Sequence, residues 1–253
     1  NNFGYIGEEP THPELLTWLA AELMEGGWTL KRMHKLIMMS RTYQMSSTGN
    51  ATGLKVDPNN DLFWRFNMRR LAAEEIRDSI LNLTGQLNLK MAGPSIYTEI
   101  PPDVAKTASR PGGAWGRSSK EDAARRSVYI FVKRSLHEPF LASFDWADTD
   151  NTCDVRFVTT VPTQTLTMIN SKFLNDAAET LAKRLQTEKP GDVNGQVRRA
   201  LELATSRPPT QQDVTEGIAF IKNFQTKSNL DENQSLQRFC LLVLNLNEFV
   251  FLD

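Results

Sequence analysis

The last third of the chain carries apolar residues at the three- and four-residue spacing of an α-helix. Such stripes run through 174–185, 197–204, 214–221 and 236–243, separated by short links that contain proline. An amphipathic helix has to bury its stripe against another element, and short links place successive helices side by side. The pattern therefore predicts a helical bundle at the end of the chain.

The first ninety residues also favour helices. Thr11–Glu14 is a capping-box pattern with a proline just inside the helix start, and Thr29 can cap a second helix after a Gly-Gly stop. Residues 50–60 are polar and predict a connection. A longer helix follows, because its apolar residues fall on one stripe: Ile76, Ile80, Leu83 and Leu87.

Two short segments favour β-structure instead. Residues 127–132 are β-branched and aromatic on both faces, so we expect a strand buried on both faces, and 157–161 is a second candidate strand. The predicted fold class is mainly α, a helical bundle with a small two- or three-stranded sheet. Residues 1–253 form either one domain or two lobes, with 1–90 helical and 91–253 holding the loop, the sheet and the bundle.

Residues 91–120 break the helical pattern with three proline- and glycine-containing clusters. Loops of this length are uncommon inside compact domains and are usually functional or mobile. We therefore expect a lid or a surface excursion, with 95–120 among the least ordered or most exposed parts of the chain. Trp115 lies in this loop and is the candidate aromatic platform for a carbohydrate ligand, because loops often carry recognition residues.

Charge and hydropathy exclude some partners. The 29 Lys and Arg residues balance 30 Asp and Glu residues to a net charge of -1, so no overall field attracts nucleic acid or an anionic membrane. No apolar run approaches the roughly 20 residues that a transmembrane helix needs. The chain opens without Met or a signal peptide, which we interpret as a fragment of a longer protein.

Cys153 and Cys240 are the only cysteines, too few for a disulfide framework. They form either a single bridge in an oxidising compartment or one loop thiol and one buried helical thiol, and the burial tendency of Cys favours the second. No C-x-x-C-H motif is present, so we expect no haem attachment and no other cofactor in this chain.

Several ordered motifs resemble one family when they are taken together. They are His12-Pro-Glu-Leu-Leu, Ser40-x-Thr-Tyr-Gln, Asp57-Pro-x-Asn60, Arg69-Arg-Leu-x-Ala-Glu-x-Ile-Arg-Asp78, Tyr129-x-Phe-Val-Lys-Arg134, Thr159-Thr-Val-Pro-x-Gln164 and Leu244-Asn-x-Asn-Glu-Phe-Val250. The chain resembles the planctomycete-specific domain of unknown function 1553 from about residue 10 to its end. The resemblance implies the C-terminal domain of a larger cytochrome-c-linked protein, exported to the periplasm or cell surface. It implies no reaction.

An acidic loop contains the one pattern that suggests a metal. Alternate residues carry oxygen side chains, as the first ligand positions of a calcium loop do: Asp148, Asp150, Thr152 and Asp154. However, Cys153 stands where such a loop needs glycine, and Thr159 where it needs a bidentate Glu. The alternative is a polar turn whose side chains bond their own backbone, and the two departures favour the turn.

The candidate catalytic residues are His137, Asp145 and Arg156. His137 follows the predicted strand 127–132 and is the histidine best placed to act as a general acid or base. The acidic loop comes soon after it, and folding that loop over the strand end would bring Asp145 toward Arg156. Such a cluster is either a ligand site or a salt-bridge network, and the network is the commoner outcome.

Arg69 and Arg70 are candidate residues for binding a sugar or a phosphate, because guanidinium groups suit planar anions. The alternative is an ion network with acidic residues of the following helix. Taken together, the sequence favours a module that binds a polysaccharide or a partner domain of the same protein. The alternative is a hydrolase acting on complex polysaccharide with a site near His137 and Asp145, and whether the chain is an enzyme is left open.

Overall fold

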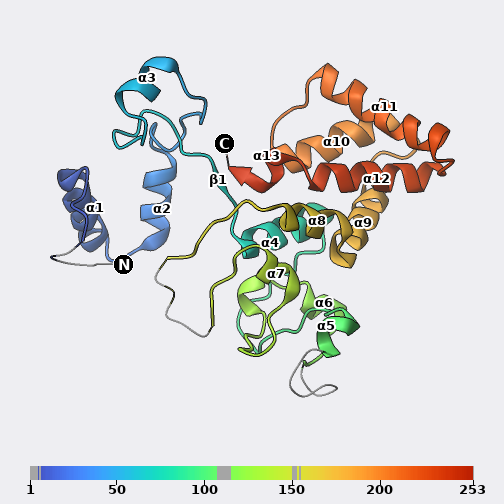
Figure 1. Cartoon of the computed structure of the whole chain (residues 1–253), viewed down its shortest axis with the longest axis horizontal. Helices are drawn as coiled ribbons and strands as arrows, with labels where there is room; N and C mark the ends of the chain where they lie inside the picture. The colour runs from blue at the N-terminus through green and yellow to red at the C-terminus, as the bar shows by residue number, and fades with distance from the viewer. Residues whose placement is uncertain (1–4, 6, 107–114, 150–152, 154, 253) are drawn as a thin grey trace. The chain divides into compact units, whose positions relative to one another are not determined.

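The structure is a computed structural model that describes residues 5, 7–106, 115–149, 153 and 155–252. The chain forms two compact units, one of Asn1–Arg69 with Leu252–Asp253 and one of Arg70–Phe251 (Figure 1). Both are built mainly from helices, which confirms the predicted mainly α fold with a small sheet. The lobe boundary expected near residue 90 falls inside the second unit.

The first unit contains the helices α1 (Pro13–Glu25), α2 (Leu30–Met38) and α3 (Ala51–Val56). Helix α1 starts at a proline. Proline lacks a backbone N–H, but an N–H in the first turn of a helix has no intrahelical acceptor, so nothing is lost there. The expected capping box at Thr11 does not form, since His12 occupies the N-cap position without a side-chain cap. Helix α3 corrects the expectation of a plain connection: Asn50 caps it by accepting a hydrogen bond from the Gly53 N–H at 2.7 Å.

Two buried polar side chains hold the turn that follows α3. Asp57 accepts hydrogen bonds from the backbone N–H groups of Asp61 and Leu62 at 2.9 and 2.8 Å. Asn60 accepts from the Arg65 N–H and donates to the Arg65 carbonyl at 2.7 Å. The turn is therefore ordered by hydrogen bonds rather than by apolar packing.

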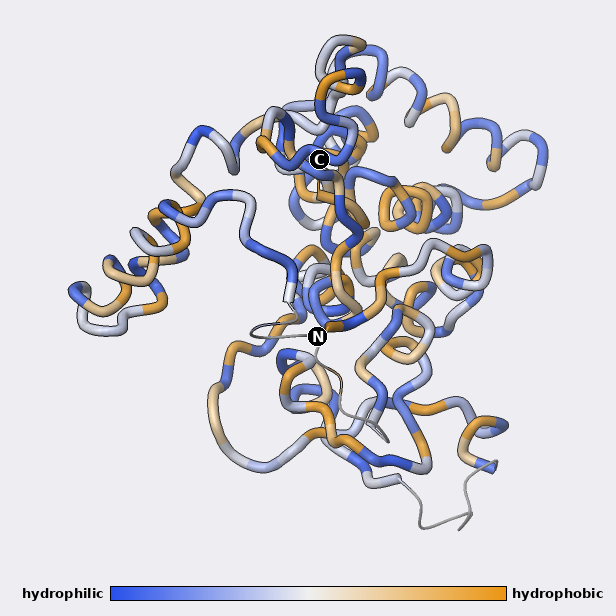
Figure 2. Tube along the Cα trace, turned by 60° about the vertical axis from the view of Figure 1, so that its left-hand side comes forward, coloured by the Kyte–Doolittle hydropathy of each residue, from blue (hydrophilic) through white to orange (hydrophobic). Residues whose placement is uncertain are grey.

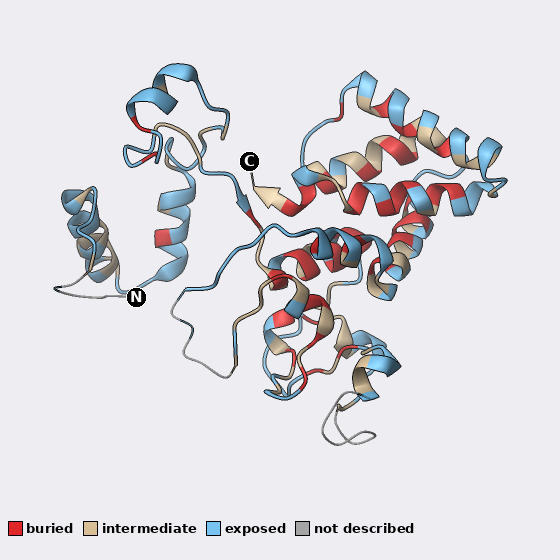
Figure 3. Cartoon of the chain, viewed as in Figure 1, coloured by how far each residue is buried: buried red, intermediate tan, exposed pale blue. Residues whose placement is uncertain are grey.

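The helices of the first unit bury very little apolar surface, as Figure 3 shows. Helix α1 has no buried residue, and α2 buries only Met33. Large apolar side chains are exposed instead, among them Leu15, Leu16, Trp18, Met24, Trp28, Leu30, Ile37, Met38 and Met39. Because most of a helix's stability comes from tertiary packing of its apolar face, these helices receive little of it.

We expect the amide protons of α1 and α2 to exchange with solvent at least about 100-fold faster than those of the bundle helices in the second unit. Exchange in a well-packed helix requires opening of its core, whereas α1 and α2 have almost no core to open. Hydrogen exchange followed by mass spectrometry on peptides of the whole chain measures this. Equal protection in both units would contradict the prediction.

Four long helices form the bundle predicted for the last third of the chain: α9 (Lys172–Glu188), α10 (Val193–Thr205), α11 (Gln211–Lys227) and α12 (Glu232–Leu244). Each begins with a side chain that accepts a hydrogen bond from the backbone three residues later, namely Ser171, Asp192, Thr210 and Asp231. Their predicted stripes are mainly buried, and α12 packs against both α9 and α11. Figure 2 shows apolar and polar residues alternating around the helical turns.

Helix α4 (Ala73–Thr84) extends this core. Ile76, Ile80 and Leu83 are buried as predicted, and α4 packs against α9 and the short helix α7 (Pro139–Ser143). Gly85 ends the helix with a φ of 76°, a left-handed conformation that glycine adopts without strain. The helix therefore stops before Leu87, which the sequence pattern included.

The predicted strand at 127–132 is wrong. Ser127–Tyr129 is a short 3₁₀ helix, and Ile130 makes only an isolated bridge with Ile96. Val128 is 70% exposed and Val132 53% exposed, so the segment is not buried on both faces. The cause lies in tertiary contacts: the Asp78 carboxylate accepts hydrogen bonds from both the backbone N–H and the hydroxyl of Ser127, at 2.7 Å each.

The second predicted strand, 157–161, is also wrong, because this segment is exposed and unpaired in any sheet before α8 (Pro162–Asn170) begins. The small sheet pairs β1 (Arg69–Arg70) with β2 (Phe251–Leu252), which follows the short helix α13 (Asn247–Val250). Among the described residues, no helix has the length and apolar character needed to cross a membrane.

The described parts of 91–120 are only partly the surface excursion that we expected. Ile96 and Thr98 are buried, and backbone hydrogen bonds of 2.8 Å join Ile96 to Tyr129 and Phe131. The helices α5 (Pro102–Lys106) and α6 (Lys120–Ala123) add exposed turns. Residues 107–114, which include one of the proline and glycine clusters, lie outside the described residues.

Three buried arginines attach the irregular segments to the helical core. Arg70, Arg77 and Arg125 are each at most 5% exposed. Arg77 donates to the carbonyls of Arg125 and Ala123, and Arg70 donates to those of Leu71, Phe144 and Thr159. A guanidinium group carries five donors in a fixed plane, so a single side chain can satisfy several buried carbonyls.

Candidate functional site

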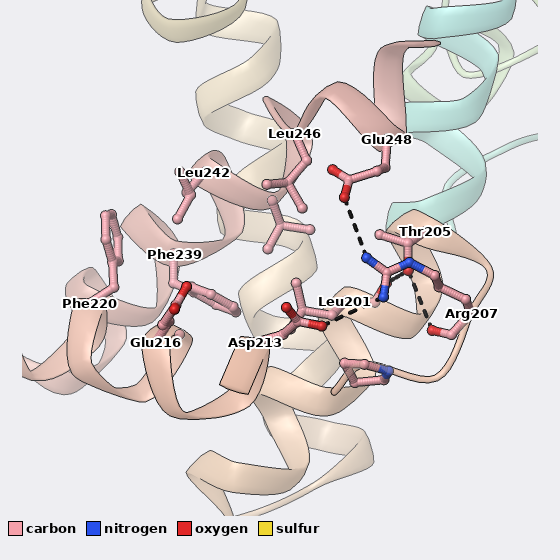
Figure 4. A pocket seen from close by; sticks show the side chains of 13 residues that line it. Leu201, Thr205, Arg207, Asp213, Glu216, Phe220, Phe239, Leu242, Leu246 and Glu248 are labelled. Carbon is pink, nitrogen blue, oxygen red and sulfur yellow. Dashed lines mark hydrogen bonds and ion pairs between the residues drawn. The ribbon is translucent and has the colours of Figure 1, made fainter. Parts of the chain in front are cut away.

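The candidate site is a groove of about 300 Å³ on the second unit, between α10, α11, α12 and α13 (Figure 4). Its lining residues are Leu201, Thr205, Arg207, Pro209, Asp213, Glu216, Gly217, Phe220, Phe239, Leu242, Val243, Leu246 and Glu248. Pockets of about 300 Å³ are at the small end of the range that holds ligands. The groove is therefore large enough to receive a few side chains of a partner.

Apolar side chains make the floor of the groove. Phe239 and Val243 are buried members of the core, whereas Leu242 is 40% exposed. Figure 4 shows Leu242 beside Phe239 among the lining side chains. Gly217 helps to shape the floor, because a Cβ atom at this position would lie 2.7 Å from Val197 Cγ1 and 3.0 Å from the Phe239 ring. The close approach of α11 to its neighbours thus depends on the missing side chain.

Charged side chains make the rim. Arg207 lies 3.6 Å from Asp213 and 3.4 Å from Glu248, and Figure 4 shows its guanidinium group between the two carboxylates. Glu216, one helical turn after Asp213, accepts a hydrogen bond from the Gln212 side chain at 2.9 Å. Three carboxylates against one guanidinium leave this rim net negative.

Hydrogen bonds hold Asp213 in its charged form. In the α11 capping box, the Thr210 N–H donates to the Asp213 carboxylate at 2.8 Å, and the Thr210 hydroxyl accepts from the Asp213 N–H at 3.2 Å. Arg207 adds an opposite charge. These contacts lower the pKa of Asp213 below its ordinary value. Asp213 therefore keeps its negative charge at neutral pH.

The predicted site residue Asp145 lies elsewhere, against Arg70. Its carboxylate contacts Arg70 at 2.6 Å and accepts hydrogen bonds from the Thr159 N–H at 2.8 Å and from the Gln164 side chain at 3.3 Å. Burial raises the pKa of Asp145, but the Thr159 hydrogen bonds and the Arg70 charge outweigh burial and hold that pKa below its ordinary value. Arg69, next in the strand, is exposed while Arg70 is buried.

His137 has different partners from Asp145. Its Nε2 atom lies 2.8 Å from the Thr149 hydroxyl, and its ring meets the Trp146 ring edge-on at 5.8 Å. Trp146 and Thr149 thus place the start of the acidic loop beside His137. The Asp145 carboxylate, however, contacts Arg70 and Thr159 instead of the imidazole ring.

Arg156 forms a two-pronged ion pair with Glu74 of α4, at 2.9 and 2.7 Å. Burial raises the pKa of Glu74, but the hydrogen bonds and charge of Arg156 outweigh it and lower that pKa. The three candidate catalytic residues thus lie in the same part of the second unit but in separate pairings, and a role in catalysis stays a prediction for each.

Trp115 belongs to an aromatic cluster. Its ring meets Tyr97 edge-on at 5.5 Å and Phe131 at 6.3 Å, and its indole N–H donates to the Thr98 carbonyl at 2.8 Å. The side chain is half-buried. Its proposed role as a carbohydrate platform stays a prediction, and the structure adds that this ring packs against the core.

The predicted calcium loop falls mostly outside the structure's described residues. Asp150 and Asp154 are not among them, and Asp148 is described. Within the described part of the chain, no cluster of three or more His, Cys, Asp or Glu residues could hold a metal ion. A calcium site at Asp148, Asp150 and Asp154 therefore stays a prediction.

The two thiols are unbridged, one exposed and one buried, as the sequence favoured. Cys153 lies in the acidic loop, and Cys240 lies in α12 within the core. Burial raises the pKa of the Cys240 thiol far above its ordinary value, so this thiol stays protonated and inert.

Sequence reasoning missed the groove and its charged rim. The segment containing Arg207 and Pro209 was interpreted only as a short link between helices. The one available signal was the capping pattern from Thr210 to Asp213, which placed a carboxylate beside that link but said nothing of Glu248. The rim forms because α13 folds back to bring a residue 41 positions away within reach of Arg207.

Comparison with known proteins supports a family but no activity. No curated protein and no solved structure matches the chain. The model of one family, described as PSD1, protein of unknown function (DUF1553), matches residues 1–221. This match covers most of the chain, including residues 1–69 of the first unit, α4 and the bundle helices α9 and α10. The chain therefore belongs to the PSD1 family of proteins of unknown function (DUF1553).

Proposed function

We propose that this chain is a non-catalytic binding module that holds a partner domain through the groove lined by α10, α11, α12 and α13. The observation that carries the proposal is the apolar floor, with Leu242 open to solvent, beside a negatively charged rim. Exposed apolar surface framed by polar residues is typical of protein interaction sites. Floor residues supply the binding energy in such a site, and the rim supplies orientation and selectivity.

The family resemblance supports another domain of the same large, cytochrome-c-linked protein as the partner. On this proposal the module works outside the cytoplasm, in the periplasm or at the cell surface of a planctomycete. A protein partner suits the groove better than a polysaccharide does, because the floor offers aliphatic and phenyl groups but few hydrogen-bonding groups for sugar hydroxyls.

The hydrolase alternative has less support. A general acid and base need to converge on one cleft within hydrogen-bonding reach of a substrate. Asp145 is engaged by Arg70 and Thr159, and Arg156 by Glu74. Neither of them, nor His137, lines the groove.

A synthetic peptide of about 15 residues tests the proposal, with a leucine-rich apolar face and a neutral polar face, because shorter helices are marginal in water. We expect the folded chain to bind it, and Leu242→Asp to weaken binding about 10-fold or more by placing a charge on the floor. The measurement is the fluorescence anisotropy of the labelled peptide.

Leu166→Asp is the matched control, because Leu166 of α8 is also an exposed leucine but does not line the groove. We expect it to bind the peptide like the unmodified chain. An equal loss in both variants, or no binding at all, would contradict the proposal. If instead the unmodified chain binds a soluble polysaccharide and Leu242→Asp does not, the ligand of the groove is a polysaccharide and not a protein domain.

A further inference from the structure

We infer that the partner of the groove is an amphipathic helix with cationic residues beside its apolar face. The inference rests on the proposed function and adds the partner's chemistry. The rim carries Asp213, Glu216 and Glu248 against the single cation Arg207, a net charge of -2 around an apolar floor. A partner that places an ammonium or guanidinium group at the rim while burying apolar side chains matches both features.

The shape of the floor favours a helix over an extended strand. Its apolar residues on α12 are Phe239, Leu242 and Val243, of which only Leu242 is exposed, and Leu246 follows after the end of α12. An extended peptide would need unpaired backbone groups to bond, and the lining is made of side chains from helices and short links.

The part of the rim on α11 follows a helical spacing. Asp213, Glu216 and Phe220 of α11 are separated by three and four residues, so two carboxylates and an aromatic edge lie along one wall. Both Glu216 and Glu248 are exposed. A cationic residue on a docked helix can therefore approach Glu216, whose hydrogen-bond partner Gln212 is neutral.

Arg207 already pairs with two carboxylates of the rim and so competes with a partner's cation for them. Its guanidinium group is about half exposed and pairs with Asp213 and Glu248 at 3.6 and 3.4 Å. Exposed ion pairs of this kind are weak, so a partner cation can exchange with it. The rim would become more negative without Arg207, with three carboxylates and no cation among its lining residues.

Two substitutions therefore have opposite expected effects on a cationic helix. Glu216→Gln removes one negative charge and should weaken binding about three-fold, the scale of one exposed ion pair. Arg207→Gln removes the competing cation and should strengthen binding about three-fold. A merely structural role for Arg207 would instead weaken binding or leave it unchanged, so the sign of this change separates the two roles.

The experiment compares three peptides of about 15 residues that share one leucine-rich apolar face and carry Lys, Gln or Glu on the polar flanks. We measure their dissociation constants with the full chain and with both variants, at low and physiological salt. The expected order of affinity is Lys, then Gln, then Glu, with the differences shrinking as salt screens the charges. Thermal melting confirms that each variant is folded.

The outcomes separate this inference from the function on which it rests. If all three peptides bind equally and Leu242→Asp abolishes their binding, the groove is a partner site. The inference that the partner is cationic is then wrong. A preference for the Lys peptide that neither Glu216→Gln nor Arg207→Gln changes also overturns it. Failure of every peptide to bind overturns the proposed function together with the inference.

Discussion

Arg125→Ala is expected to lower the free energy of unfolding by about 3 kcal/mol, because it removes one side chain that satisfies several buried carbonyls. Arg125 is 2% exposed and donates to the carbonyls of Lys90, Ala92 and Pro94. Its guanidinium group also lies 4.0 Å above the centre of the Tyr129 ring. Without it, the carbonyls of this turn lose their donor and the ring loses its cation.

Urea unfolding followed by circular dichroism measures the change, and Arg238→Ala is the control. Arg238 is an exposed arginine of α12, so its loss should change the free energy of unfolding by less than about 0.5 kcal/mol. Arg125→Lys should fall between the two, because a single ammonium group keeps the charge but cannot reach three carbonyls. A loss in Arg125→Ala no larger than in the control would show that the turn does not depend on this side chain.

Glu138→Ala is expected to lower the free energy of unfolding by about 2–3 kcal/mol, since Glu138 caps α7 and faces a buried charge. Its carboxylate accepts a hydrogen bond from the Leu141 N–H at 2.7 Å and is 6% exposed. The nearby Arg77 guanidinium is buried too, and burial lowers the Arg77 pKa while the Glu138 charge raises it. Glu138→Gln should cost less, because its amide oxygen can still accept from Leu141.

The pH dependence of the Glu138 effect has a definite sign. Burial raises the pKa of Glu138 above its ordinary value of 4.5. Between 4.5 and the raised pKa the folded state binds a proton more readily than the unfolded state, so the Glu138 contribution to stability falls as pH rises through this window. The contribution is fully present below 4.5 and constant above the raised pKa.

Comparing the unmodified chain with Glu138→Gln from acid to neutral pH isolates this effect. We expect the unmodified chain to lose stability relative to Glu138→Gln as pH rises, because glutamine does not titrate. A difference that is flat across the window, or that grows in the other direction, would show that burial does not raise the pKa of this carboxyl group. Urea midpoints at fixed ionic strength provide the measurement.

The bundle helices could be predicted from sequence because their determinants are local. Apolar spacing in α9 and caps such as Ser171 and Thr210 each act within a few residues of the chain. Family membership was likewise carried by short ordered motifs. These features do not depend on which distant segment packs against the helix.

The failed strand at 127–132 shows where local information ends. Its β-branched residues suit a pleated surface only if neighbours cover them, and β-propensity depends strongly on that context. In the structure, Asp78 binds both the N–H and the hydroxyl of Ser127 from 49 residues away, while Val128 and Val132 face solvent. A long-range hydrogen bond thus decided a conformation that local composition could not.

The sequence by itself determined the helical bundle, the family and the balance of charge in this protein, because periodicity, caps and composition act along the chain. Only the tertiary structure decided which charged residues are buried and where a groove opens. Arg125 and Arg238 are the same residue type, yet one is enclosed by carbonyls and the other is exposed. Arg207 and Glu248 of the groove are 41 positions apart in the sequence, and only the packing of α10, α11, α12 and α13 brings them together.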